Sequence, residues 1–105
     1  MTDVLICKDK AAELLTEMGE GPLTIGRIVA WICDREGLLT RREKMDAFDT
    51  SYNYIPEIIN GRRRAPLRQA VLWMQRLGYP EFIPLIARIS AQQNLDAMLE
   101  RVRPF

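Results

Sequence analysis

The sequence predicts an all-α protein, a compact bundle of short helices. Two observations support this fold class. Apolar residues recur at spacings of three and four along most of the 105 residues, and no segment sustains the alternation that is typical of strands. Residues that start or end helices (threonine, serine, proline and glycine) divide this pattern into short segments. The length fits one domain spanning residues 1–105.

The first two predicted helices cover about residues 3–18 and 24–36. Thr2 can cap the first helix and Gly19 can end it, while a short strand over Val4–Cys7 is an alternative for its start. Gly37 ends the second helix, whose apolar residues follow the i, i+3, i+4, i+7 spacing. The expected buried faces comprise Val4, Cys7, Ala11, Leu14, Leu15 and Met18 in the first helix and Ile25, Ile28, Val29 and Ile32 in the second.

Three further helices follow in the middle of the chain. Thr40 can cap a helix over Arg41–Phe48, and Ser51 can cap a fourth that ends at Asn60-Gly61. Pro66 suits the first turn of a fifth helix, which stops at Gly78. The apolar face expected on the fifth helix consists of Leu67, Ala70, Val71, Met74 and Leu77.

The last part of the chain contains two apolar stripes that are out of phase. Pro80 and Pro84 fall in the opening turns of a sixth helix. In one continuous helix the second stripe would point away from the first. Either the chain bends within residues 90–94, where Asn94 could cap a separate last helix, or one helix buries two faces. The second stripe covers the core or forms a dimer seam, and we favour the seam. The first stripe is Phe82, Leu85, Ile86 and Ile89, and the second is Leu95, Met98, Leu99 and Val102.

Composition argues against several classes of function. No apolar run approaches the ~18–20 residues of a membrane helix, and the N-terminus lacks the basic region of an export signal, so we expect a cytoplasmic protein. Histidine, the commonest metal ligand and general acid or base, is absent. Cys7 and Cys33 are expected to be buried small hydrophobes. We therefore expect no enzyme, no metal, no cofactor and no small-molecule substrate.

Positive charge is concentrated in the middle of the chain. Residues 1–39 carry four basic and seven acidic side chains, whereas residues 40–76 carry eight basic and four acidic ones. Residues 77–105 carry three of each. The middle third is therefore the basic part, although the net charge of the whole chain is only +1.

The stretch LLTRREKMDAFDTSYNYIPEIINGRRRAP, from Leu38 to Pro66, resembles the lambda-repressor-like (XRE) family of helix-turn-helix regulators. This resemblance implies a five-helix unit over about residues 24–91, with an N-terminal helix in 1–23 and a C-terminal helix in 92–105 added to it. The matching pieces are DREG at 34–37, LTRRE at 39–43, Ser51, Ile55, Ile58, Asn60-Gly61, Arg63 and Pro66.

The resemblance also implies a DNA-binding surface. Tyr52, Asn53 and Tyr54 would open the recognition helix and face base edges, where an asparagine can bond adenine at two atoms. Glu57 lies near the same face and would read a base only by accepting from a cytosine. Basic side chains at both ends of this helix would meet phosphates, helped by free backbone N–H groups in the first turn of the preceding helix. The expected phosphate contacts are Arg41, Arg42, Arg62, Arg63, Arg64 and Arg68.

Several residues depart from the family pattern. Lys44 and Met45 stand where the family usually has a buried leucine and an alanine, and Asp49 occupies the usual turn glycine. Pro56 lies inside the recognition helix. If that helix starts at Tyr52, Pro56 loses one hydrogen bond; otherwise the regular helix begins at Pro56 itself.

A few side chains allow a purely structural interpretation. Trp31 and Trp73 flank the apolar stripes, and we expect them to pack at the edge of the core rather than to bind a partner. Asp46 and Asp49 are read as surface and turn residues. Tyr52 and Tyr54 would either shield a helix end or contact DNA.

The expected function is that of a sequence-specific DNA-binding transcriptional regulator of the phage, plasmid or antitoxin type. It would act as a homodimer on double-stranded DNA, because one short recognition helix reads too few base pairs to be selective. The alternative is a helix-turn-helix-derived module that binds a protein partner, such as an anti-activator, an inhibitor or an assembly subunit.

Overall fold

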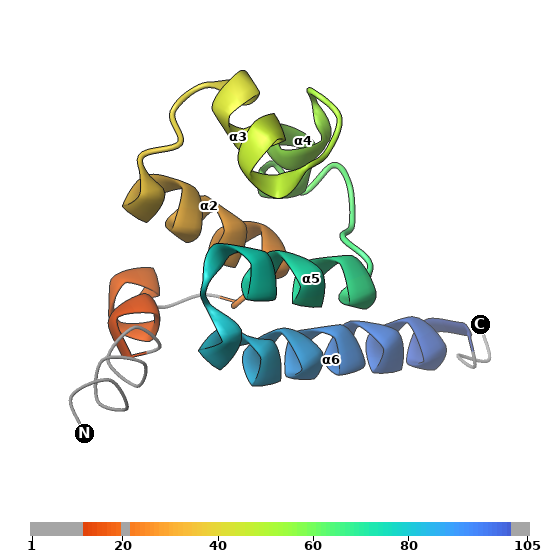
Figure 1. Cartoon of the computed structure of the whole chain (residues 1–105). Helices are drawn as coiled ribbons and strands as arrows, with labels where there is room; N and C mark the ends of the chain where they lie inside the picture. The colour runs from red at the N-terminus through yellow and green to blue at the C-terminus, as the bar shows by residue number, and fades with distance from the viewer. Residues whose placement is uncertain (1–11, 20–21, 102–105) are drawn as a thin grey trace.

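The structure, a computed structural model, describes residues 12–19 and 22–101, with only the backbone described at residue 101. Every regular element in these residues is helical, which confirms the predicted all-α bundle (Figure 1). Residues 12–18 form a first helical segment. It is followed by α2 (Ile25–Glu36), α3 (Arg41–Phe48), α4 (Tyr54–Ile59), α5 (Leu67–Leu77), the short 3-10 helix η1 (Pro80–Phe82) and α6 (Ile83–Arg101).

The predicted caps at Gly37 and Thr40 are present, and Thr24, expected as the first residue of its helix, is instead the N-cap of α2. Thr24 accepts a hydrogen bond from the Arg27 backbone N–H (3.2 Å), and Gly37 ends α2 with a left-handed φ of 71°. Thr40 and Glu43 form a reciprocal capping box at the start of α3, with N···O distances of 3.1 and 2.9 Å. Both helices therefore have the bounds that these local signals predict.

Helix α4 starts at neither of the two expected residues. It begins at Tyr54, so the predicted starts at Tyr52 and at Pro56 are both wrong. Asn53 stands at the N-cap without a side-chain bond, and Ser51 contributes only its carbonyl oxygen, which accepts from the Tyr54 N–H at 3.2 Å. Pro56 is the third residue of the helix, where a backbone N–H would have no intrahelical partner. The proline therefore fits its helix without costing a hydrogen bond.

Helices α5 and α6 lie side by side (Figure 1). Pro66 caps α5 in an extended conformation instead of opening its first turn, and Gly78 ends α5 with a φ of 86°. Pro84 is the second residue of α6. That helix is continuous, so the predicted bend within residues 90–94 and the cap at Asn94 are wrong, and no separate C-terminal helix begins at residue 92.

The two apolar stripes of α6 have different environments. Ile86 in the first stripe is completely buried. Leu95, Met98 and Leu99 in the second are 48%, 61% and 57% exposed, so this stripe does not cover the core. Val102 lies outside the described residues.

Both tryptophans belong to the core. Trp73 is 1% exposed and Trp31 8% exposed, so Trp73 lies deeper than the predicted core edge. Phe48 and Tyr54 pack edge-on against Trp73, with ring centroids 5.4 and 5.9 Å away. The buried residues are Leu14, Ile25, Ile28, Val29, Trp31, Ile32, Cys33, Phe48, Ile55, Ile58, Ala65, Ala70, Trp73, Met74, Tyr79, Phe82 and Ile86.

The N-terminal helical segment packs on α2. Its Glu17 carboxylate accepts a hydrogen bond from the Trp31 indole N–H, and Leu14 is completely buried. Leu15, which was expected on the buried face, is 50% exposed. The predicted buried residues Val4, Cys7 and Ala11 and the alternative strand over Val4–Cys7 lie outside the described residues.

Cys33 is a buried hydrophobic residue, as expected, and burial raises the pKa of its thiol to about 11. Within residues 12–19 and 22–101, no cluster of three or more histidine, cysteine or acidic side chains has an arrangement that could hold a metal ion. In the same ranges, no helix is both long enough and apolar enough to cross a membrane.

Candidate nucleic-acid interface

Helices α3 and α4 form the end of the molecule that lies farthest from α6 (Figure 1). Helix α4 is seated directly on α2. A Cβ atom added to Gly26 would lie 2.4 Å from the carbonyl oxygen of Ile58, so no larger residue fits without movement of the α4 backbone. This contact was not anticipated from the sequence, where the only signal is a glycine within a predicted helix.

A tight turn over residues 49–53 connects the two helices. Asp49 ends α3 in a left-handed conformation, with φ 55° and ψ 57°, as expected for a residue in the place of a turn glycine. The Thr50 N–H donates to the carbonyl of Met45 (3.1 Å), which closes the C-terminus of α3. The turn leaves Tyr52 and Asn53 exposed at the end of the molecule.

Three predicted site residues come together at this turn. The Arg41 Nη1 donates to Asn53 Oδ1 across 2.6 Å, and the Arg41 guanidinium lies over the ring of Tyr52, with its Cζ 5.9 Å from the ring centroid. Arg41 was expected to bind phosphate, but it belongs to the same group as the expected base-contacting residues. A two-atom bond to adenine would have to use the second lone pair of Asn53 Oδ1, because the first accepts from Arg41.

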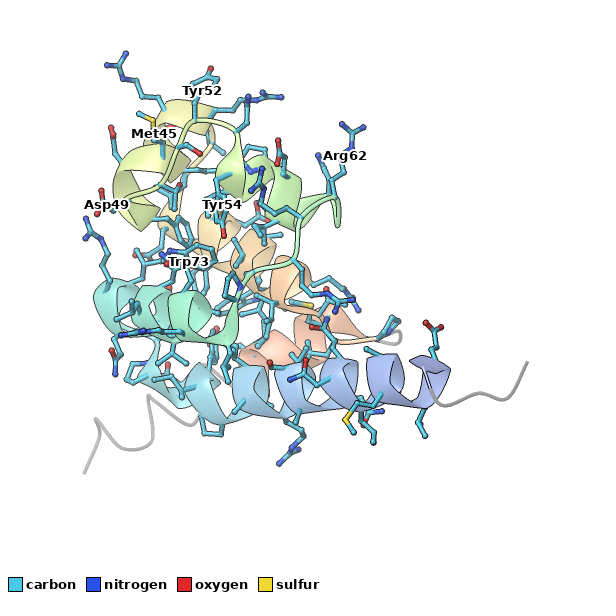
Figure 2. The ribbon with its side chains drawn as sticks, turned by 90° about the vertical axis from the view of Figure 1, so that its right-hand side faces the viewer. Met45, Asp49, Tyr52, Tyr54, Arg62 and Trp73 are labelled. Atoms are coloured by element: carbon cyan, nitrogen blue, oxygen red, sulfur yellow. The ribbon has the colours of Figure 1, made fainter. Side chains whose placement is uncertain are left out.

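Tyr54, the third expected base-contacting residue, faces the other way. Its ring is half-buried against the core and contacts Trp73, whereas Tyr52 projects outward (Figure 2). These tyrosines were expected either to shield a helix end or to contact DNA. Tyr54 shields the start of α4, whereas Tyr52 is exposed at the surface.

Glu57 and Arg63 form an ion pair within the chain. The Arg63 Nε donates to Glu57 Oε2 at 2.8 Å, and its guanidinium covers the Tyr54 ring, with Cζ 5.0 Å from the centroid. The hydrogen bond to Glu57 raises the pKa of Arg63 above its ordinary value. Glu57 therefore pairs with Arg63 and links α4 to the loop that follows it.

The other predicted phosphate-binding arginines lie at separate places. Arg62 is exposed and projects away from the loop after α4 (Figure 2). Arg64 lines a shallow hollow of about 250 Å³ together with Gln93 of α6. Arg68 lies in the first turn of α5. Within the described residues, no hydrogen bond or ion pair engages the side chains of Arg42, Arg62, Arg64 and Arg68.

The N-terminus of α3 differs from the expected anion site. The capping box takes two of its N–H groups, those of Thr40 and Glu43. It also fixes a carboxylate there, and the bonds that Thr40 donates lower the pKa of Glu43. The capping box leaves the backbone N–H groups of Arg41 and Arg42 in this turn, so the expectation that this turn binds phosphate stays a prediction.

Two of the residues that depart from the family pattern support the α3–α4 end. Lys44 is half-buried and its ammonium group donates to the carbonyl of Leu39 (3.2 Å), so it serves as a local brace where the family has leucine. Met45 is also half-buried, and its carbonyl oxygen accepts from the Thr50 N–H. Asp46 is exposed, as expected. The Arg76 Nε of α5 donates to the carbonyl of Ala47 (3.0 Å), which ties α3 to α5.

Comparisons extend this description no further. No family model, characterised protein or solved structure matches this chain. The candidate interface therefore rests on the residues at the α3–α4 end and on their geometry.

Proposed function

We propose that the protein is a sequence-specific DNA-binding regulator in which α3, the turn over residues 49–53 and α4 act as a helix-turn-helix. The observation that carries the proposal is the set of exposed side chains at this end. Arg41, Tyr52 and Asn53 form one contact group. Arg42 follows Arg41 in α3 and Arg62 lies in the loop after α4, and both side chains are exposed without a partner in the described structure. The planar polar groups of the contact group suit contacts to base edges, and the two unpaired arginines suit contacts to phosphates.

The dimensions of α4 are compatible with this role. An α-helix with its side chains is about 10–12 Å across, which fits the ~12 Å width of a major groove, and the six residues of α4 add only about 9 Å of length. Because so short a helix contacts few base pairs, selective binding requires two copies on a two-fold site. The exposed stripe of Leu95, Met98 and Leu99 on α6 offers a surface for that second copy.

Binding to a random-sequence duplex over a series of salt concentrations tests the proposal. The logarithm of the binding constant should fall with the logarithm of the salt concentration, because phosphate contacts release counterions. Replacing Arg42 and Arg62 together with alanine should flatten the slope by about two units. Arg88→Ala is the matched control, since Arg88 is also exposed and belongs to α6, which lies at the opposite end of the molecule (Figure 1).

Two results would refute the proposal. One is a wild-type protein that binds no duplex even at low salt. The other is a double variant whose slope equals that of the wild type. Arg63→Ala should change the slope less than Arg62→Ala, because Glu57 already neutralises Arg63.

A protein partner at the same end is the second candidate. Leu39, next to the start of α3, is 79% exposed, and an exposed leucine beside polar side chains is compatible with a protein contact. Its signature would be a tight, salt-insensitive complex with another protein together with no affinity for DNA.

A further inference from the structure

We propose that Arg41 is the base-reading residue of this surface and that it selects guanine, with Asn53 and Tyr52 as its positioning residues. This inference rests on the proposed DNA-binding function. It assigns a recognition chemistry that differs from the adenine contact expected of an asparagine in this place.

The geometry joins two elements that are separated in the chain. Arg41 opens α3 and Asn53 is the N-cap of α4, yet Arg41 Nη1 and Asn53 Oδ1 are 2.6 Å apart. The Tyr52 ring lies beside the guanidinium, at 5.9 Å from its Cζ. Arg41 is thus held by a hydrogen bond and an aromatic face, while all three residues remain exposed.

The hydrogen-bonding groups of this cluster select the base. A guanidinium has five N–H donors and no acceptor, so four donors remain after the bond to Asn53. One of the two lone pairs of Asn53 Oδ1 accepts from Arg41, and Asn53 also offers its two Nδ2 donors. Arg41 and Asn53 together therefore present donors to a groove. Guanine presents two acceptors there, N7 and O6, whereas adenine presents the acceptor N7 beside the N6 donor. Donors facing the adenine N6 group gain nothing, so the pair discriminates in favour of guanine.

Arg41 has partners that fix its side chain, and in the described part of the chain Arg42 and Arg62 do not. A long side chain loses rotamer freedom when it binds, and a partner that already fixes it lowers that cost. Asn53 and Tyr52 supply such partners for Arg41, whereas no hydrogen bond or ion pair engages the side chains of Arg42 and Arg62 within the described residues. Freely moving cations suit phosphate contacts, which carry no base preference.

Selection of binding sites by the full chain from a random duplex library tests the inference. The wild type should enrich guanine at a fixed position of the selected site. Arg41→Ala should lose a preference for guanine over adenine of about ten- to a hundredfold at that position. Arg42→Ala is the matched control, and it should weaken binding to all sequences while keeping the guanine preference.

Two further measurements separate reading from positioning. Replacing the selected guanine with 7-deazaguanine removes the N7 acceptor, and it should weaken the wild type but not Arg41→Ala. Asn53→Ala should keep a reduced guanine preference, because Arg41 is still present but no longer held. Far-UV circular dichroism spectra and melting temperatures equal to those of the wild type would show that the variants are folded.

The outcomes distinguish a failure of the guanine assignment from a failure of the proposed DNA-binding function. Salt-dependent DNA binding in which Arg41→Ala keeps the guanine preference overturns the inference alone. Enrichment of adenine that Asn53→Ala abolishes overturns it as well, since Asn53 would then be the reader. A wild type that binds no duplex at low salt overturns the proposed function itself.

Discussion

Single residues in the turn after α3 decide which side chains face outward at the candidate interface. Asp49 takes a left-handed conformation, so the chain turns sharply at the end of α3. Residues 52 and 53 therefore precede α4 and do not follow its helical geometry. The sequence predicted a helix that starts at Tyr52 or at Pro56. Because the direction of a side chain depends on where its helix starts, this prediction did not give the contact of Tyr54 with Trp73. The Arg41–Asn53 and Glu57–Arg63 pairs also escaped sequence reasoning, since each depends on the exact path of a loop.

Replacing Asp49 with glycine should stabilise the fold. The left-handed conformation costs a residue with a Cβ about 1–2 kcal/mol, and glycine avoids this cost. Glycine also has more conformational freedom in the unfolded chain, which offsets part of the gain in stability. We expect a net gain of about 0.5–1 kcal/mol in the free energy of unfolding, measured by urea titration. Asp46→Gly, in the body of α3, is the control and should destabilise by about 0.3 kcal/mol, the difference between the helix propensities of aspartate and glycine. A loss of stability in Asp49→Gly would contradict this description of the turn.

At the level of elements, the bounds of α2 and α3 and the end of α5 were predictable because their signals are local. Thr24, Thr40, Gly37 and Gly78 cap their helices through neighbouring backbone groups. The course of α6 was not predictable in this way. Its two out-of-phase apolar stripes left open either a bend or one helix with two buried faces, and the structure has one continuous helix whose second stripe is exposed.

Gly26→Ala tests how α4 is seated on α2. Helix propensity alone would favour alanine by about 1 kcal/mol. The added methyl would, however, lie 2.4 Å from the Ile58 carbonyl oxygen, and this clash should outweigh propensity and destabilise by roughly 1–3 kcal/mol. Thermal and urea unfolding measure the change. Asp34→Ala, at an exposed position of the same helix, should cause little loss. A variant Gly26→Ala more stable than the wild type would show that α4 does not pack against this residue.

At the level of the whole molecule, the core and the exposed stripe of α6 lead to a prediction about assembly. Leu95, Met98 and Leu99 are about half exposed or more, so they contribute little to the stability of a single chain. A second copy presenting the same stripe would bury both surfaces in a self-complementary interface.

The double replacement of Leu95 and Leu99 by glutamate should therefore give a folded monomer. Sedimentation velocity measures the assembly state and far-UV circular dichroism the fold. Leu72→Glu, on α5 and 51% exposed, is the control and should leave the dimer intact. The half-site affinity of the monomer should be much lower than that of the dimer for a two-fold operator. An unfolded double variant, or a wild type that sediments as a monomer, would contradict this account of the stripe.

Titration of the ¹⁵N-labelled protein with duplex DNA tests most directly whether the α3–α4 end is the surface that contacts DNA. Amide signals of Arg41, Arg42, residues 51–54 and residues 60–64 should shift together as duplex is added. The shifts should disappear when salt is raised, because the flanking contacts are made to phosphates. Signals of α6 at Leu95, Met98 and Leu99 should stay in place. Shifts concentrated on α6, or no shift at the α3–α4 end with any duplex at low salt, would contradict the account.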